Sequence, residues 1–368
     1  MKILFDHEVF SYQPVGGIAR YYAELISELE RLEPGSCLAG FRFTNTEYLY
    51  RKGLDRKFSL CRYPFPESRI SKPFFFRLNR ICFERALKYG KPDVVHLTYY
   101  PRPEWSRRIS RPVAITVHDM IPELYPQYFA GGGKWMEAKR FWCGRADRIF
   151  TVSEQTRKDL LRLFPEVSPE KVFSIYNSGT VAEEQKMLPC PKPYLLYVGR
   201  RDGYKHFLFA LQALAPLFQQ ERRLFLVCAG GGAFSTEERD AIRRNGMQDR
   251  TVQYSCTDAE LSYLYRNGEL LLYPSQYEGF GIPVTEAFSA GLPVVLSRSS
   301  CFPEIAGDAA LFFDPDDAES LRAAVRRLLG EPELRKELCA RGTERLKRFS
   351  WETSARRILT HYRSMIRS

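Results

Sequence analysis

The chain is predicted to be an α/β protein with two parallel-sheet domains. Short apolar runs alternate with amphipathic helical segments along all 368 residues, and this alternation is typical of parallel sheets covered by helices. The length also exceeds that of a usual single domain. Residues 177–193 contain turn residues and three prolines without a hydrophobic period, so the linker is placed there. We therefore expect domains at 1–180 and 181–350, followed by a last helix at 351–368.

The first domain is expected to contain several strands and at least three helices. Helical periodicity is present at residues 20–32 and 71–90, and Ser153 suits the N-cap of a helix that follows it. The strands are predicted at 2–6, 37–43, 58–63, 92–97, 111–117, 148–152 and 172–176.

The second domain shows the same alternation. Thr257 and Asp317 are predicted to cap helices, with Glu260 at the capping-box position of the first. The strands are predicted at 194–199, 223–230, 251–256, 270–273, 293–298 and 309–315.

Composition narrows the classes of function. No run of eighteen apolar residues and no signal-peptide region is found, and nine scattered cysteines without a CxxC pair favour a reducing cytoplasm. The formal charge of +11 suits nucleic acid, an anionic membrane or a phosphorylated substrate. Because no nucleic-acid-binding signature is found, we expect no nucleic-acid partner and favour a membrane surface together with a nucleotide diphosphate.

The most informative stretch runs from the strand at 270–273 to Gly291. Gly279 and Gly281 occupy the loop after this strand, and Pro283 marks the start of a helix predicted at 284–290. Glycines let a ligand approach the backbone, and a helix N-terminus suits phosphate. Glu278 and Glu286 offer acceptor oxygens for the hydroxyls of ribose or a sugar. A nucleotide sugar has both kinds of group.

Two further segments carry candidate residues at strand ends. Arg200, Arg201 and Lys205 follow Gly199, and such cations could neutralise a leaving diphosphate or simply face solvent. His118 follows the strand at 111–117, where it could meet a hydroxyl or be a buried structural histidine.

The sequence E-G-F-G-I-P-V-T-E from Glu278 to Glu286 resembles the paired-glutamate motif of the retaining glycosyltransferases of family 4. The resemblance implies the GT-B fold, with two Rossmann-like domains facing a central cleft and a last helix that crosses back to the first domain. It implies a catalytic set of Lys205, Arg200 or Arg201, Glu278 and His118. The donor-binding residues that it implies are Gly17, Gly199, Gly279, Phe280, Gly281, Ile282 and Glu286.

The same resemblance gives expectations about the reaction. Glu286 would hold ribose hydroxyls and Glu278 the hydroxyls of the donor sugar. Because no Asp-x-Asp motif accompanies the cations, neither metal nor cofactor is expected. The segments FDHEVF, GGIARYY and VHDMIPEL resemble bacterial mannosyltransferases for surface polysaccharide, which favours GDP-mannose over a UDP- or ADP-sugar donor. The acceptor would be a glycan or a polyprenyl-linked sugar.

Other interpretations stay open from the sequence. Residues 71–90 form a basic amphipathic helix whose Phe74–Phe76 could contact the inner face of the membrane or pack in a core. A related epimerase or phosphorylase is one alternative to a transferase. A non-catalytic binder of nucleic acid or membrane is another, since the charge alone would support it.

Overall fold

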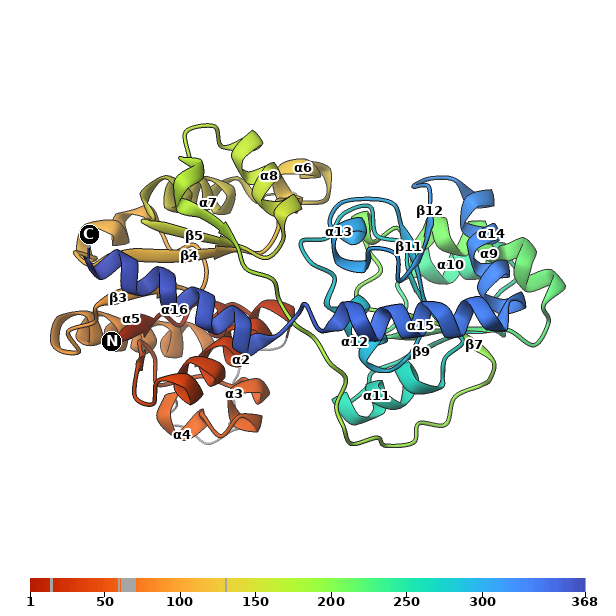
Figure 1. Cartoon of the computed structure of the whole chain (residues 1–368), viewed down its shortest axis with the longest axis horizontal. Helices are drawn as coiled ribbons and strands as arrows, with labels where there is room; N and C mark the ends of the chain where they lie inside the picture. The colour runs from red at the N-terminus through yellow and green to blue at the C-terminus, as the bar shows by residue number, and fades with distance from the viewer. Residues whose placement is uncertain (14–15, 59, 61–70, 130, 368) are drawn as a thin grey trace. The chain divides into compact units, whose positions relative to one another are not determined.

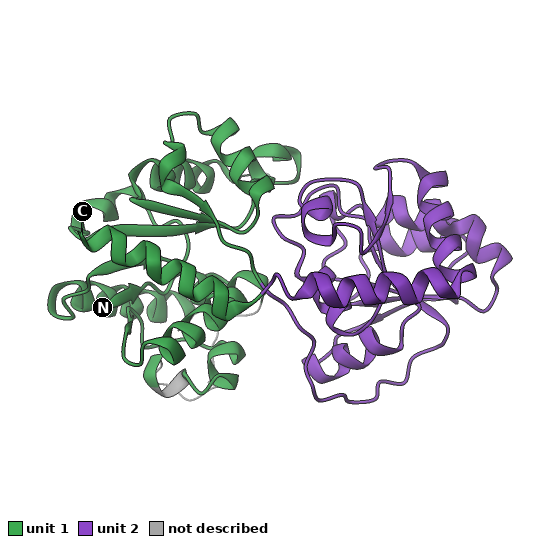
Figure 2. Ribbon diagram, viewed as in Figure 1, with its two compact units in different colours: residues 1–177, 350–368 green, residues 178–349 purple. Residues whose placement is uncertain are grey.

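The protein is described by a computed structural model over residues 1–13, 16–58, 60, 71–129 and 131–367. The chain divides into two compact units (Figure 2): unit 1 comprises residues 1–177 and 350–368, and unit 2 comprises residues 178–349. Each unit contains a six-stranded parallel sheet with helices around it (Figure 1). The predicted α/β class with two parallel-sheet domains is confirmed.

The sheet of unit 1 has the order β2-β1-β3-β4-β5-β6. The strand β1 lies between β2 and β3, so Ile3 pairs with Cys37 on one side and with Val94 on the other. The strand order therefore reverses between β1 and β3, and this position is the switch point of the sheet. The strands are β1 (Ile3–Phe5), β2 (Cys37–Ala39), β3 (Val94–Leu97), β4 (Val113–Val117), β5 (Arg148–Thr151) and β6 (Val172–Ser174).

The last helix of the chain belongs to unit 1. It packs against α2 along an apolar face, and Tyr362 hydrogen-bonds to buried His96 of β3. The α-helices of unit 1 are α1 (Glu8–Tyr12), α2 (Gly17–Leu32), α3 (Glu47–Arg51), α4 (Asp55–Phe58), α5 (Ser71–Tyr89), α6 (Ile121–Leu124), α7 (Gly133–Arg145), α8 (Glu154–Leu163) and α16 (Trp351–Arg367). The 3-10 helices are η1 (Pro103–Arg108), η2 (Pro126–Tyr128) and η3 (Pro169–Lys171).

Two predicted strands of unit 1 differ from the structure. The strand predicted at 37–43 is shorter, because β2 ends at Ala39. The segment at 58–63, also predicted as a strand, begins inside the helix α4, and Phe58 is buried there beside Phe41. Residues 59 and 61–63 lie outside the described residues. Tertiary burial of Phe58 therefore outweighs its preference for extended structure.

The sheet of unit 2 has the order β12-β11-β10-β7-β8-β9. The strand β7 pairs with β8 on one side and with β10 on the other, so the switch point lies between β7 and β10. The strands are β7 (Tyr194–Val198), β8 (Phe225–Ala229), β9 (Thr251–Tyr254), β10 (Leu270–Tyr273), β11 (Val294–Ser297) and β12 (Leu311–Phe313).

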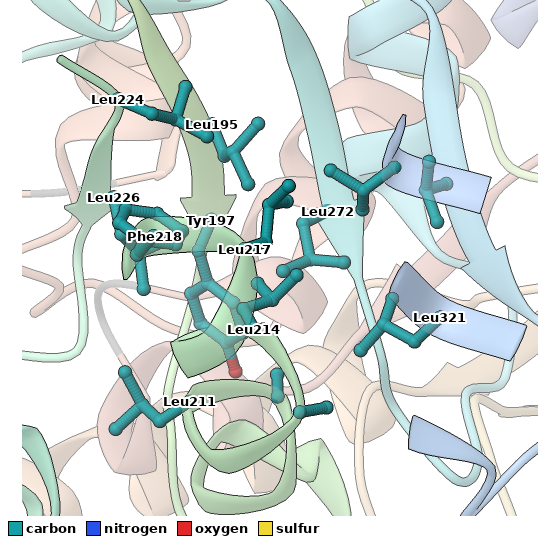
Figure 3. Packing of buried hydrophobic residues seen from close by; sticks show 14 of the residues in the cluster. Leu195, Tyr197, Leu211, Leu214, Leu217, Phe218, Leu224, Leu226, Leu272 and Leu321 are labelled. Carbon is teal, nitrogen blue, oxygen red and sulfur yellow. The ribbon is translucent and has the colours of Figure 1, made fainter. Parts of the chain in front are cut away.

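A large apolar cluster supports this sheet. Leu195 and Tyr197 of β7 and Leu272 of β10 pack against Leu214 of α9 and Leu321 of α14 (Figure 3). The switch point is thus held on a rigid core. The helices of unit 2 are η4 (Gly203–Lys205), α9 (Phe207–Gln220), α10 (Thr236–Arg244), α11 (Asp258–Asn267), α12 (Ile282–Ser289), α13 (Phe302–Ala306), α14 (Ala318–Gly330) and α15 (Pro332–Leu346).

The predicted helix caps are confirmed. The Ser153 side chain accepts from the backbone of Thr156 at the start of α8, and Asp317 caps α14. Thr257 and Glu260 form a complete capping box on α11. Local sequence alone therefore sets these helix starts.

Candidate active site

Lys205 and Glu278 meet at the switch point of unit 2. Lys205 ends η4, which follows β7, and Glu278 follows β10. The Lys205 Nζ donates to Glu278 Oε1 at 2.5 Å, and both side chains are largely buried. Lys205 Nζ also lies over the rings of Tyr204 and Tyr273. An open parallel sheet binds ligands at this edge, so the pair stands where a ligand is expected.

Ser300 fixes the backbone of Glu278. Its hydroxyl accepts from the Glu278 amide at 3.2 Å and donates to the Glu278 carbonyl at 2.6 Å. Ser300 itself has φ +52°, a left-handed conformation that costs free energy in a residue other than glycine. The two hydrogen bonds hold it there, so Ser300 is a positioning residue for Glu278.

The loop after Glu278 leads directly into α12. Gly281 is the N-cap with φ +82°, a conformation that glycine adopts without strain. The helix begins at Ile282 and Pro283 is its second residue, so the predicted start at Val284 was two residues late. Phe280 is buried and packs edge-on against Phe349 with ring centroids 5.5 Å apart. Buried packing thus holds the loop beside a helix N-terminus that suits phosphate.

Glu286 lies in the second turn of α12 and is buried. The hydroxyl of Tyr265, from α11, donates to Glu286 Oε2 at 2.8 Å. A buried carboxylate needs hydrogen-bond partners, and Tyr265 supplies one of them while fixing the direction of the carboxylate.

Arg200 and Arg201 have different environments, although they are adjacent. Arg200 is exposed and makes a paired contact with Asp202, with Nη2–Oδ2 at 2.7 Å. Arg201 is buried and pairs with Glu238 through Nε–Oε1 at 3.0 Å. In addition, Arg201 donates to the carbonyls of Gly230, Gly231, Gly232 and Ala233.

The contacts of Arg201 organise the loop after β8. Gly230, Gly231 and Gly232 all have φ between +72° and +81°, so this loop bends through three consecutive left-handed residues. The guanidinium of Arg201 donates hydrogen bonds to their carbonyls. Its partner Glu238 forms a capping box with Ser235 at the start of α10. Of the two arginines, Arg200 is therefore the exposed one at this edge, whereas Arg201 holds the loop after β8.

His118 follows β4 in unit 1 and is enclosed by aromatic rings. Its ring meets Tyr21 and Tyr22 of α2 edge-on, with centroids 4.8 and 5.8 Å apart. Burial, aided by the charge of Lys139, lowers the pKa of His118 to about 3, so the imidazole is neutral at physiological pH. Its Nε2 atom is buried and has no hydrogen-bond partner among the described residues.

Gly17 is the first residue of α2, the helix that also carries Tyr21 and Tyr22. The structure thus brings His118 and the helix that begins at Gly17 together in unit 1. The other predicted site residues belong to unit 2, where Gly199 follows β7 with φ +118°. Their roles toward a substrate stay predictions.

The metal expectation needs one correction. Asp314-Pro315-Asp316 does have the Asp-x-Asp spacing, and it directly follows β12. Asp316 pairs with His206 Nε2 at 3.2 Å, and His206 is the residue after Lys205. In the described part of the chain, no three His, Cys, Asp or Glu side chains gather as metal ligands. Whether the reaction needs a metal stays a prediction.

Two family models account for most of the chain. Residues 15–178 match the model described as Glycosyltransferase Family 4, and residues 181–345 match the model described as Glycosyl transferases group 1. The chain belongs to glycosyltransferase family 4. Two six-stranded parallel sheets with helices give this glycosyltransferase the GT-B fold.

Similar proteins agree with this assignment. The glycosyltransferase is 29% identical over 382 residues to the O-antigen chain mannosyltransferase B of Escherichia coli, covering 99% of this chain and 100% of that protein. It is 28% identical over 247 residues to the O-antigen chain mannosyltransferase RfbU of Salmonella typhimurium, covering 66% of each. HepE from Anabaena, solved with UDP and glucose, matches with a TM-score of 0.75 at 16% identity, covering 99% of this chain and 100% of that one.

Sequence reasoning missed the residues that hold the predicted ones in place. Three such residues lie outside the motifs, namely Tyr265, Ser300 and Glu238. Each hydrogen-bonds to a motif residue that is distant in the sequence, so only the folded chain brings the two together. A capping-box pattern at Ser235 and Glu238 was readable, but it could not reveal the partner Arg201.

Proposed function

We propose that this glycosyltransferase transfers mannose from GDP-mannose to a sugar hydroxyl of a surface-polysaccharide acceptor, with retention of the anomeric configuration. The Lys205–Glu278 pair at the switch point is the observation that carries the proposal, because it places a cation and a hydroxyl acceptor side by side. A diphosphate sugar needs both groups at adjacent positions. The choice of mannose is supported by the names of the two bacterial relatives.

Different residues of unit 2 would bind different parts of the donor. Glu286, held by Tyr265, would accept from the ribose hydroxyls. The backbone at the start of α12 would meet the phosphates. Lys205 and Arg200 would neutralise the departing GDP, which requires Arg200 to release Asp202 and Lys205 to turn from Glu278. Glu278 would then be free to hold the mannose hydroxyls.

His118 would contact the donor sugar near the reacting carbon. Its neutral imidazole and buried, unpartnered Nε2, among the residues described, suit a hydrogen bond to a hydroxyl. Retention would follow from attack on the face that the diphosphate leaves, with the leaving phosphate accepting the proton of the incoming hydroxyl. Because side-chain cations would balance the leaving charge, we propose that no metal is required.

A membrane surface is the second part of the proposal. Within the described residues, no helix combines the length and apolar character needed to cross a bilayer. The helix α5 nevertheless exposes Phe74 (59%), Ile81 (52%) and Tyr89 (66%). Exposed basic residues accompany them, namely Lys72, Arg77, Arg80, Arg85 and Lys88. Such a surface complements anionic lipids on the cytoplasmic face, where lipid-linked acceptors would be met.

A thermal-shift panel tests the proposal directly. The protein is heated with GDP, UDP, ADP and their sugars, with and without EDTA. A ligand at about a hundred times its dissociation constant adds roughly 2.7 kcal/mol of stability, which is easily detected. We expect stabilisation by GDP and GDP-mannose that EDTA does not change. Stabilisation by UDP or ADP alone would show that the donor carries that nucleotide instead of GDP. Stabilisation by none of them would favour a non-catalytic binder, whose binding Glu286→Ala should leave unchanged.

A further inference from the structure

A cavity of about 980 Å³ lies in unit 1, at the switch point of its sheet. Its lining includes Glu8, from the helix after β1, and Tyr99, from the loop after β3. Side chains from α5 and α7, both labelled in Figure 1, and from η1 complete the wall. Ligands bind at the carboxyl ends of strands where the strand order reverses, and the volume is typical of small-molecule sites.

A buried hydrogen-bond network holds Glu8 in the wall of this cavity. Thr98 donates to the Asp6 carboxylate through its hydroxyl and, at 3.2 Å, through its amide. The amide of Glu8 donates to the same carboxylate at 3.0 Å, and the amide of Val9 donates to Thr98 Oγ1 at 3.1 Å. Asp6 therefore ties the end of β3 to the start of α1, and this tie sets the position of Glu8.

Glu8 lines the cavity, and the residue as a whole is only 8% exposed. Among the described residues, the hydrogen bond of Glu8 to Asp6 is made by its backbone amide, and its carboxyl has no hydrogen-bond or ion-pair partner. Burial and repulsion from Asp6 raise the pKa of Glu8 to about 8, although Arg102 opposes the rise. Near neutral pH the group can therefore accept a hydrogen bond or donate one. A hydroxyl can serve as partner in both cases.

Aromatic rings form one continuous side of the cavity. The ring centroids of Tyr12 and Phe76 are 5.4 Å apart, those of Tyr12 and Tyr99 are 6.2 Å apart, and those of Tyr99 and Trp135 are 5.7 Å apart. Flat apolar rings beside a few polar groups suit a pyranose ring, which has C–H patches on its faces and hydroxyls at its rim.

The charges of the lining indicate which sugars would fit. The ionisable side chains are three acids and three bases, namely Glu8, Glu104, Glu137, Arg80, Arg102 and Lys134. With Glu8 largely protonated near neutral pH, two acids face three bases, but Arg80 is already paired with Glu84. The lining therefore has no excess charge for a phosphate or a sugar acid. Six ionisable groups are also unsuited to a lipid tail, since burying them without partners is unfavourable.

We propose that this cavity receives an uncharged pyranose unit of the acceptor glycan. One face of the ring lies on the wall of Tyr12, Tyr99 and Trp135, and the hydroxyls meet Glu8 and Arg102. The inference rests on the proposed transferase function, and it assigns acceptor recognition to side chains of unit 1.

Saturation-transfer NMR tests the cavity without any turnover. The probes are methyl α-mannoside and α-mannobiose, added to the full chain without donor. The test variants are Tyr12→Ala and Arg102→Ala, both at exposed positions where folding is not threatened, and Tyr50→Ala on α3 is the matched control. We expect transfer to the ring protons in the wild type and the control, and a signal about tenfold weaker in Tyr12→Ala.

Two outcomes overturn the inference: no transfer from the wild type to either probe, or equal transfer in Tyr12→Ala. A parallel thermal shift with GDP separates this inference from the proposed function. If transfer to the probes is equal in Tyr12→Ala and GDP still stabilises the protein, the cavity is not the acceptor site but the proposed transferase function stands. If Tyr12→Ala abolishes transfer but no nucleotide stabilises the protein, sugar binding in the cavity is supported and the donor assignment is wrong.

Discussion

Lys205 Nζ lies 2.5 Å from Glu278 Oε1, although 73 positions separate the two residues in the chain. Each is held by its own surroundings: Lys205 by the rings of Tyr204 and Tyr273, and Glu278 by the Ser300 hydroxyl. Without a donor, each charge satisfies the other. A bound diphosphate sugar would divide the pair, with the phosphate taking the cation and the sugar taking the carboxylate.

Replacing Lys205 should lower turnover without preventing folding. In Lys205→Ala we expect kcat to fall by on the order of a hundredfold or more, because the leaving diphosphate loses a cation. Steady-state kinetics with GDP-mannose measures it. Lys336→Ala, which removes a 73%-exposed lysine from α15, is the control and should leave kcat unchanged. Unchanged turnover in folded Lys205→Ala would exclude the residue from the mechanism.

The two neighbouring arginines should respond in opposite ways. Arg201→Ala leaves Glu238 buried without its partner and removes donors from four carbonyls, so we expect a loss of about 3–5 kcal/mol in the free energy of unfolding. The free energy of unfolding of Arg200→Ala should lie within about 0.5 kcal/mol of the wild-type value, because the partner Asp202 is exposed. The same variant should nevertheless lose activity. Urea denaturation together with activity assays separates them. A stable, inactive Arg201→Ala would reverse the two roles.

Glu286 should matter for affinity more than for folding. Glu286→Gln replaces a charged acceptor by a neutral one, so GDP should bind about tenfold to a hundredfold more weakly. Tyr265→Phe should weaken binding less, since it only removes the group that directs the carboxylate. Isothermal titration calorimetry measures both. Glu333→Gln, at an 85%-exposed side chain, should bind GDP as the wild type does, and equal affinity in Glu286→Gln would exclude a ribose contact.

Glu8 should make stability depend on pH. Its pKa rises from the ordinary value of 4.5 to about 8 on folding, so between these values the folded state binds more protons than the unfolded one. The free energy of unfolding therefore falls as the pH rises through this range. From about pH 5 to about pH 8, the Tm of the wild type should fall more than that of Glu8→Gln. Parallel curves for the two proteins would show that Glu8 titrates normally.

Membrane contact through α5 should depend on Phe74. Phe74→Ser removes the exposed ring, so co-sedimentation with vesicles of phosphatidylcholine and phosphatidylglycerol at low salt should fall about tenfold. Phe141→Ser, at a 39%-exposed phenylalanine of α7, is the matched control and should bind as the wild type does. If wild-type protein ignores these vesicles, the membrane part of the proposal is wrong.

Much of the fold could be predicted because its signals are local. Buried strands such as β10 are continuous apolar runs, and the caps of α8, α11 and α14 are short motifs. The strand predicted at 58–63 is wrong at its first residue, because Phe58 ends the helix α4 and packs on Phe41. An aromatic residue suits a strand as well as a buried helix end, so periodicity could not distinguish the two. Residues 59 and 61–63 lie outside the described residues.

The partners within the candidate site could not be predicted for a different reason. Arg200 and Arg201 are equivalent by sequence position, and the choice depends on Glu238, 37 positions away. Tyr265 reaches Glu286 over 21 positions, and neither position carries a signal for the other. Pair contacts of this kind arise from topology, which periodicity and motif spacing do not encode.

Unit 1 is built from both ends of the chain, and this has a consequence for biosynthesis. The helix α16 covers α2 and reaches His96 through Tyr362, but it is synthesised after the whole of unit 2. Unit 2 is contiguous, so all of its residues leave the ribosome after residues 1–177 but before α16. Unit 1 therefore becomes complete only after unit 2 has been synthesised, whereas N-terminal domains usually fold first during synthesis. The apolar face of α2 therefore stays uncovered until α16 has been synthesised.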